Sequence, residues 1–126
     1  MKKFNLLSSF PKSKRSLKER HVNKKNIQIA LKYSREYFDG SRSQGYGGYY
    51  YDGRWVAVAN KIIKLFNLKN NSKFLDIGCA KGFLIHDLKI ILPKLKIYGI
   101  DISQYAKDNS ILNIKKNIKI MNCKKL

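Results

Sequence analysis

An aspartate and two glycines have the spacing with the clearest chemical meaning in this 126-residue chain. Asp76 lies at the end of the apolar run KFLDI, and Gly78 and Gly82 follow it in the stretch GCAKG. Glycines between a strand and a helix let the backbone approach a ligand without interference from Cβ atoms. A carboxylate in such a turn repels a pyrophosphate at the helix N-terminus but attracts a cation such as an α-ammonium group. The motif therefore predicts a ligand with a positively charged tail.

A second acidic residue, Asp101, directly follows the next apolar run, KIYGI, and lies 25 positions after Asp76. At the tip of a second strand, a carboxylate is placed to accept hydrogen bonds from both hydroxyls of a ribose. Two acidic strand tips with a glycine turn between them are more specific than either part. A nucleoside with a positively charged tail satisfies both, and S-adenosylmethionine fits that description.

Residues 73–126 resemble the class I S-adenosylmethionine-dependent methyltransferases. The stretch DIGCAKG is similar to motif I of that family, and GIDIS is similar to its acidic second-strand tip. The earlier stretch YFDGSRSQGYGGYYYDGRW resembles the leader of a bacterial subgroup that is sometimes encoded near surface-polysaccharide genes. The resemblance implies a methyltransferase with a small-molecule or saccharide acceptor.

The resemblance also assigns cofactor-binding positions. The eight positions are Asp76, Gly78, Cys79, Ala80 and Gly82 around motif I, Asp101 at the ribose, Ile102 against the adenine, and Asn122 at the adenine amino group. Cys79 is most simply a small residue that fills the tight turn. Family members often have an aspartate where this chain has Asn122, whose carbonyl accepts the same hydrogen bond without the charge. Residues that face the transferred methyl group belong to a fourth strand in this family, so no catalytic residue is assigned.

The glycine- and tyrosine-rich segment 40–55 allows several interpretations. A disordered tract is disfavoured by the amphipathic patterns on both sides, and a nucleic-acid stacking platform stays open because tyrosines among arginines suit bases. We expect a lid with glycine hinges, in which Tyr46 and Tyr49 cover the adenosine or the acceptor and Arg42 or Arg54 binds a carboxylate or phosphate. The structural alternative is a loop whose tyrosines pack on the sheet edge.

The formal net charge of +19 raises the alternative of a non-catalytic, basic nucleic-acid-binding module on the same fold. However, the chain has 22 lysines, 15 isoleucines and 11 asparagines, the residues that adenine- and thymine-rich codons encode, and its lysines are spread along the whole sequence. Coding bias is therefore favoured over a dedicated nucleic-acid surface.

The remaining composition bears on location and metals. Cys79 and Cys123 lack the companions of a disulfide framework or a zinc site, and free thiols suit a reducing compartment. No apolar run is long enough for a membrane span or a signal peptide. We expect a cytoplasmic protein without a metal site.

Hydrophobic spacing predicts the elements that position these residues. One amphipathic helix is expected from Asn26 to Phe38 and a second from Trp55 to Asn67. After the glycine turn, a helix is stopped by Pro93, and another is capped by Ser103 and runs through Ile111 or Leu112. With strands at 73–76, 96–101 and 117–121, the order is strand, helix, strand, helix, strand. This order predicts an α/β fold with a partial Rossmann-like parallel sheet.

Three regions are therefore expected: a basic arm at 1–25, a helical leader with the glycine–tyrosine loop at 26–71, and the first half of an S-adenosylmethionine-binding domain at 72–126. The chain ends directly after its third predicted strand, which leaves one sheet edge unbuilt. We expect a truncated chain, because parallel strands usually need partners and helix cover on both faces. An unfinished edge also predicts self-association.

Overall fold

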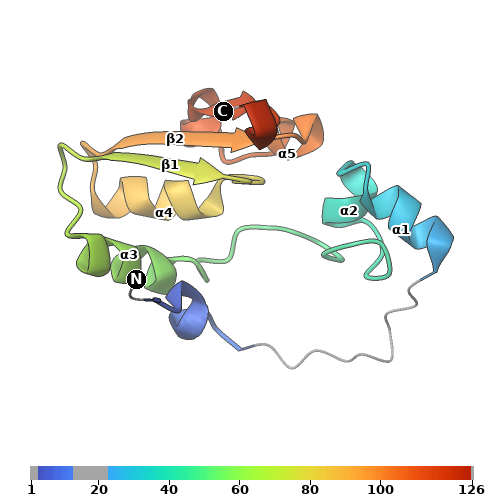
Figure 1. The fold of residues 1–126 in the computed structure, drawn as a ribbon, viewed down its shortest axis with the longest axis horizontal. Helices are drawn as coiled ribbons and strands as arrows, with labels where there is room; N and C mark the ends of the chain where they lie inside the picture. Colours follow the sequence, from blue (N-terminus) through green and yellow to red (C-terminus); the bar gives the residue numbers. More distant parts are fainter. Residues whose placement is uncertain (1–2, 13–22, 126) are drawn as a thin grey trace.

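The computed structural model describes residues 3–12 and 23–125. Its centre is a parallel sheet in the order β1-β2-β3, formed by β1 (Lys73–Ile77), β2 (Lys96–Asp101) and β3 (Ile118–Ile120). The carboxyl ends of the strands face the short helices of the leader (Figure 1). The predicted α/β class is confirmed. Residues 1–2 and 13–22 of the predicted basic arm lie outside the described residues, and the three-region division stays a prediction.

Two helices build the core beneath the sheet. The crossover from β1 to β2 is α4 (Phe83–Ile91), and α3 (Val56–Phe66) packs against α4 (Figure 1). Their apolar faces bury Val58, Ala59, Ile62, Ile85 and Leu88 in one cluster with Ile97 of β2. As expected, α3 ends at Asn67, which adopts a left-handed conformation, and α4 ends just before Pro93.

The prediction of one helix from Asn26 to Phe38 is wrong. The chain forms α1 (Lys24–Ala30) and α2 (Arg35–Asp39), separated by Tyr33 at φ +48°. The hydroxyl of Ser103 donates a hydrogen bond to the Tyr33 carbonyl at 2.5 Å. This distant contact and the burial of Phe38 outweigh the local preference for a continuous helix.

The helix predicted from Ser103 through Leu112 is also too long. Ser103 does cap α5 (Gln104–Asp108), because its Oγ accepts a hydrogen bond from the Ala106 amide at 3.0 Å. The chain then rewinds as the 3₁₀-helix η3 (Leu112–Asn117), which buries Ile114 completely. Packing of Ile114 against the glycine turn replaces the regular helix that local spacing predicted.

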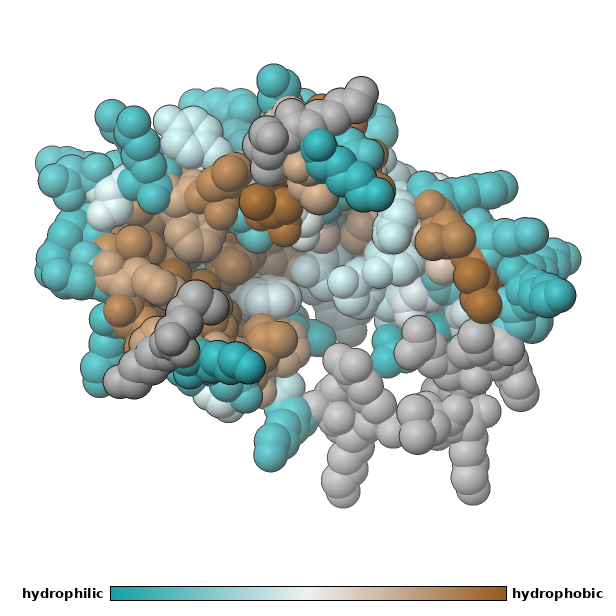
Figure 2. All heavy atoms as spheres, in the orientation of Figure 1, coloured by the Kyte–Doolittle hydropathy of each residue, from teal (hydrophilic) through white to brown (hydrophobic). Residues whose placement is uncertain are grey.

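Two further 3₁₀-helices complete the described chain. At the N-terminal end, η1 (Leu6–Ser9) packs on α3, and η4 (Cys123–Lys125) follows β3. On the strands, Leu75, Ile77 and Tyr98 remain about half exposed, and Figure 2 shows apolar residues gathered over the sheet and the helices next to it. Within residues 3–12 and 23–125, β1 pairs only with β2.

The described part of the chain offers neither a membrane-spanning helix nor a metal cluster. There, helices are too short and too polar to cross a bilayer. The same residues contain no cluster of three or more His, Cys, Asp or Glu side chains arranged to hold a metal ion.

Candidate functional site

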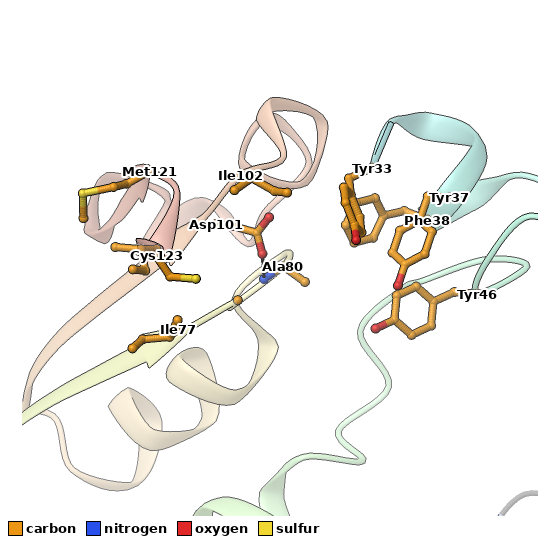
Figure 3. Close-up of a pocket in the computed structure, with 12 residues that line it drawn as sticks. Tyr33, Tyr37, Phe38, Tyr46, Ile77, Ala80, Asp101, Ile102, Met121 and Cys123 are labelled. Atoms are coloured by element: carbon orange, nitrogen blue, oxygen red, sulfur yellow. Dashed lines mark hydrogen bonds between the residues drawn. The ribbon is translucent and has the colours of Figure 1, made fainter. Parts of the chain in front are cut away.

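A cleft of about 320 Å³ lies at the carboxyl ends of β1 and β2. One wall comes from the sheet and the turn after β1, and the other comes from the leader. Figure 3 shows Tyr33, Tyr37, Phe38 and Tyr46 across the cleft from Ala80, Asp101 and Ile102. Segments far apart in the sequence therefore share one concave site, at the position where open α/β sheets bind ligands.

The two glycines of the turn serve different purposes. Gly78 has φ +79°, and a Cβ built on it would meet no atom within 4 Å, so this backbone faces the open cleft. Gly82 has φ +77°, and a Cβ there would lie 2.4 Å from Cδ1 of Ile114. Gly78 thus leaves room for a ligand, whereas Gly82 lets the start of α4 approach η3 closely.

Asp101 is oriented by main-chain amides on both sides. Its Oδ2 accepts a hydrogen bond from the Ala80 amide at 2.7 Å, and its Oδ1 accepts one from the Ser103 amide at 2.8 Å. Ala80 adopts a left-handed conformation at φ +51° to make this contact. A carboxylate has about four acceptor positions, so each oxygen of Asp101 retains capacity for a ligand hydroxyl.

Asp76 lies in β1 opposite Gly99 and does not line the cleft directly. Burial, and then the negative charge of Asp101, raise the pKa of Asp76 to about 6. Among the described residues, its carboxylate has no hydrogen-bond or ion-pair partner. A largely buried carboxylate without a partner is destabilised in its charged form, and a nearby cation would relieve this.

The structure brings four of the eight assigned cofactor positions to the cleft: Gly78, Ala80, Asp101 and Ile102. Cys79 is buried instead, with its Sγ against Gly99, and burial, followed by the charges of Asp76 and Asp101, raises the pKa of the thiol to about 12. Such a thiol stays protonated and fills space.

At the end of β3, the cleft-lining residues are Met121 and Cys123. Asn122, the residue expected at the adenine amino group, does not line the cleft. Its side-chain Oδ1 instead accepts a hydrogen bond from the Lys124 amide at 3.0 Å. Spacing alone does not indicate which residues after β3 line the cleft, because η4 turns the chain immediately.

Of the residues expected to form a lid, only Tyr46 lines the cleft. Tyr49 stacks between Tyr46 and Phe83, with ring centroids at 4.4 and 4.7 Å. Arg42 donates to the Tyr46 carbonyl at 2.8 Å, and Arg54 forms an ion pair with Asp52. Both arginines thus have partners within their own segment.

Sequence reasoning missed the aromatic wall from the first half of the leader. Tyr33 and Tyr37 line the cleft, and their rings meet edge to face at 5.1 Å, while Phe38 stacks on Tyr46 at 5.9 Å. The signal available was the density of aromatic residues just before the glycine–tyrosine segment. The helical spacing places Phe38 only on one face of a helix.

The electrostatic character of the cleft contrasts with that of the whole chain. Lys and Arg make up 27 of the 126 residues, yet among the described residues that line the cleft none is Lys or Arg. The lining is aromatic and aliphatic, with the carboxylate of Asp101 as its charged group. Such a site suits a cationic ligand and is unsuited to phosphates.

Comparisons with known proteins give matches among solved structures only, because no family model and no curated protein matches the chain. A SAM dependent methyltransferase from Aquifex aeolicus is 26% identical over 51% of this chain, with a TM-score of 0.38. Coclaurine N-methyltransferase bound to N-methylheliamine and SAH is 16% identical over 82% of this chain, with a TM-score of 0.47. The chain spans 37% and 32% of the lengths of these two proteins.

Proposed function

We propose that this chain binds S-adenosylmethionine as part of a methyltransferase. The observation that carries the proposal is the pair of carboxylates, Asp76 and Asp101, on adjacent strands, with the open backbone of Gly78 beside a cleft whose described lining contains no cationic side chain. Asp101, held by two amides, is suited to accept from the ribose hydroxyls. Asp76 is suited to balance the α-ammonium group.

The residues fit this ligand in charge and in shape. S-adenosylmethionine carries an ammonium group and a sulfonium whose methyl group is transferred to a nucleophile. The side chains of Ile102, Met121 and Cys123 provide an apolar surface for the adenine. The aromatic wall shields the ligand from water, and a positioned ligand is the main requirement for in-line methyl transfer.

The acceptor and the cellular setting belong to the same proposal. We infer a small-molecule or saccharide acceptor, to be tested with sugars of surface polysaccharides, and a cytoplasmic location. No described residue is assigned as a catalytic base.

A nucleic-acid-binding role is the second candidate, and the net charge of +19 favours it. Phosphate contacts would have to lie outside the cleft, because its described lining lacks Lys and Arg. The two candidates therefore predict binding at different surfaces.

Calorimetric titration with S-adenosylhomocysteine tests the proposal. Asp101→Ala should weaken binding by about 1–3 kcal/mol through the loss of hydrogen bonds to a charged acceptor, and Gly78→Val should abolish it by filling the cleft. Asp108→Ala, at an exposed carboxylate on α5, is the matched control and should bind like the parent. If the folded parent binds only RNA or DNA, in a salt-dependent manner, the nucleic-acid role replaces the methyltransferase.

A further inference from the structure

The leader and the glycine turn meet in a polar cluster that lies next to Phe38 of the aromatic wall. Lys81, in the turn before α4, is only 6% exposed. Its Nζ donates to both carboxylate oxygens of Asp39, at 2.9 and 2.7 Å, and to the Tyr49 carbonyl at 2.7 Å. Asp39 also accepts from the Tyr49 amide at 3.0 Å and from the Tyr105 hydroxyl at 2.7 Å. Four segments are joined at one ion pair.

Both members of the ion pair directly follow a residue that lines the cleft. Asp39 directly follows Phe38, and Lys81 directly follows Ala80. The Tyr46 and Gly48 amides donate to the carbonyls of Tyr37 and Phe38, at 2.8 and 3.0 Å. The glycine–tyrosine segment is therefore bonded to α2, and the ion pair fastens both to the turn that holds Asp101.

The chemistry of Lys81 restricts what it can do. An ammonium group has three N–H donors, and all three have acceptors within the protein. Burial by itself would raise the pKa of Asp39, but the hydrogen bonds from Lys81, the Tyr49 amide and Tyr105 hold it below its usual value. Lys81 is buried and Asp39 is partly exposed. Removing the Lys81 ammonium group from water is expensive, so holding two segments in one arrangement is a better account of the ion pair than added stability.

We propose that Lys81 is a positioning residue that, through Asp39, holds the wall formed by Tyr37, Phe38 and Tyr46 against the ligand in the cleft. This inference rests on the proposed function, because the wall acts on bound cofactor. It gives the segment the role of a fixed wall of the cleft. The wall would leave the cleft only when the contact between Lys81 and Asp39 breaks.

The test uses the full 126-residue chain, the variant Lys81→Met and the control Lys89→Met. Lys89, on α4, also donates from Nζ to a main-chain carbonyl, that of Leu95 at 2.9 Å, away from the cleft. Hydrogen exchange of the Tyr46 and Gly48 amides reports on the wall, exchange of amides within α4 reports on the global fold, and calorimetry measures S-adenosylhomocysteine affinity.

For Lys81→Met, we expect the exchange rates of the Tyr46 and Gly48 amides to rise, relative to the parent, by more than those of amides within α4. We also expect the Kd for S-adenosylhomocysteine to rise roughly tenfold, which corresponds to about 1.4 kcal/mol. The control should change neither quantity. A purely structural role would speed exchange everywhere and leave the Kd of the folded fraction unchanged. If Lys81→Met fails to fold, Asp39→Asn, which keeps the side-chain shape, is measured in the same way.

Faster exchange of the wall amides without a higher Kd, or a higher Kd without faster exchange, overturns the proposal. A loosened wall must weaken binding, and weakened binding must come from a loosened wall. No change in both overturns it as well. A parent that binds no S-adenosylhomocysteine removes the proposed function and this inference with it. A parent that binds and a folded variant that matches it remove this inference alone.

Discussion

Replacing Asp76 by asparagine should stabilise the protein while weakening cofactor binding. The carboxylate is largely buried, has no partner among the described residues and lies near the charge of Asp101. Asparagine keeps its shape and removes the charge. If the proposed cationic ligand binds beside Asp76, the protein carries this penalty until the ligand arrives.

The magnitude follows from the pKa. Burial and Asp101 raise the pKa of Asp76 from 3.8 to about 6, and a tenfold change in the proton equilibrium corresponds to about 1.4 kcal/mol. At neutral pH the charged carboxylate therefore lowers the free energy of unfolding by about 2–3 kcal/mol, after allowance for its remaining solvent contact. The folded state binds the proton more tightly than the unfolded state does. The destabilisation by the charged carboxylate is therefore absent below pH ~4, and it develops fully as pH rises through about 6.

Urea denaturation of the parent and Asp76→Asn across this pH range measures the effect. The two proteins should be equally stable near pH 4, and the variant should be more stable by about 2–3 kcal/mol near pH 7. Calorimetry at neutral pH should show weaker binding of S-adenosylhomocysteine by the variant, and binding by the parent should weaken as pH falls below about 6. A stability difference that is the same at both pH values, or a less stable variant at neutral pH, refutes the reasoning. Asp108→Asn, at an exposed carboxylate, is the control.

Three further perturbations act on backbone and packing. Ala80→Gly relieves the left-handed conformation at φ +51° and should raise the free energy of unfolding by about 0.5–1 kcal/mol; a loss of stability in urea denaturation contradicts this. Gly82→Ala places a Cβ 2.4 Å from Cδ1 of Ile114 and should cost about 2–4 kcal/mol in the same assay, so an unchanged midpoint would mean that the turn is looser than described. Leu75→Lys puts a charge beside Tyr98 on the exposed sheet face and should raise the monomer fraction in sedimentation. The effect should be largest at high salt, where the net charge no longer opposes association. Equal sedimentation of both proteins argues against association through this face.

Features with a short sequence range were predictable. The strand tips at Asp76 and Asp101 and the turn at Gly78 follow from apolar runs that end in a fixed order of residue types. The ends of α3 and α4 follow from Asn67 and Pro93. In each case the residues that determine the structure are near neighbours, so local physical rules suffice.

Features that depend on distant contacts could not be predicted in this way. The break between α1 and α2 depends on Ser103, 70 residues from Tyr33. The ion pair between Asp39 and Lys81 joins positions 42 residues apart. Helical spacing places Phe38 on the apolar face of a helix, and the side chain is indeed buried, but the spacing does not reveal that the same ring borders the cleft. Such pairings require the folded arrangement of several elements at once.

The two amides that hold Asp101 also make this carboxylate observable. Amide protons that donate to a carboxylate respond in NMR spectra to changes in its charge and in its other partners. Ala80 and Ser103 donate to different oxygens of Asp101, and Ser103 is linked through its hydroxyl to Tyr33 of the leader. Their two resonances therefore report from opposite sides of one acceptor, one from the glycine turn and one from the start of α5, which contacts the leader. A ligand that engages both oxygens would shift both resonances, whereas a movement confined to the leader would shift that of Ser103 alone.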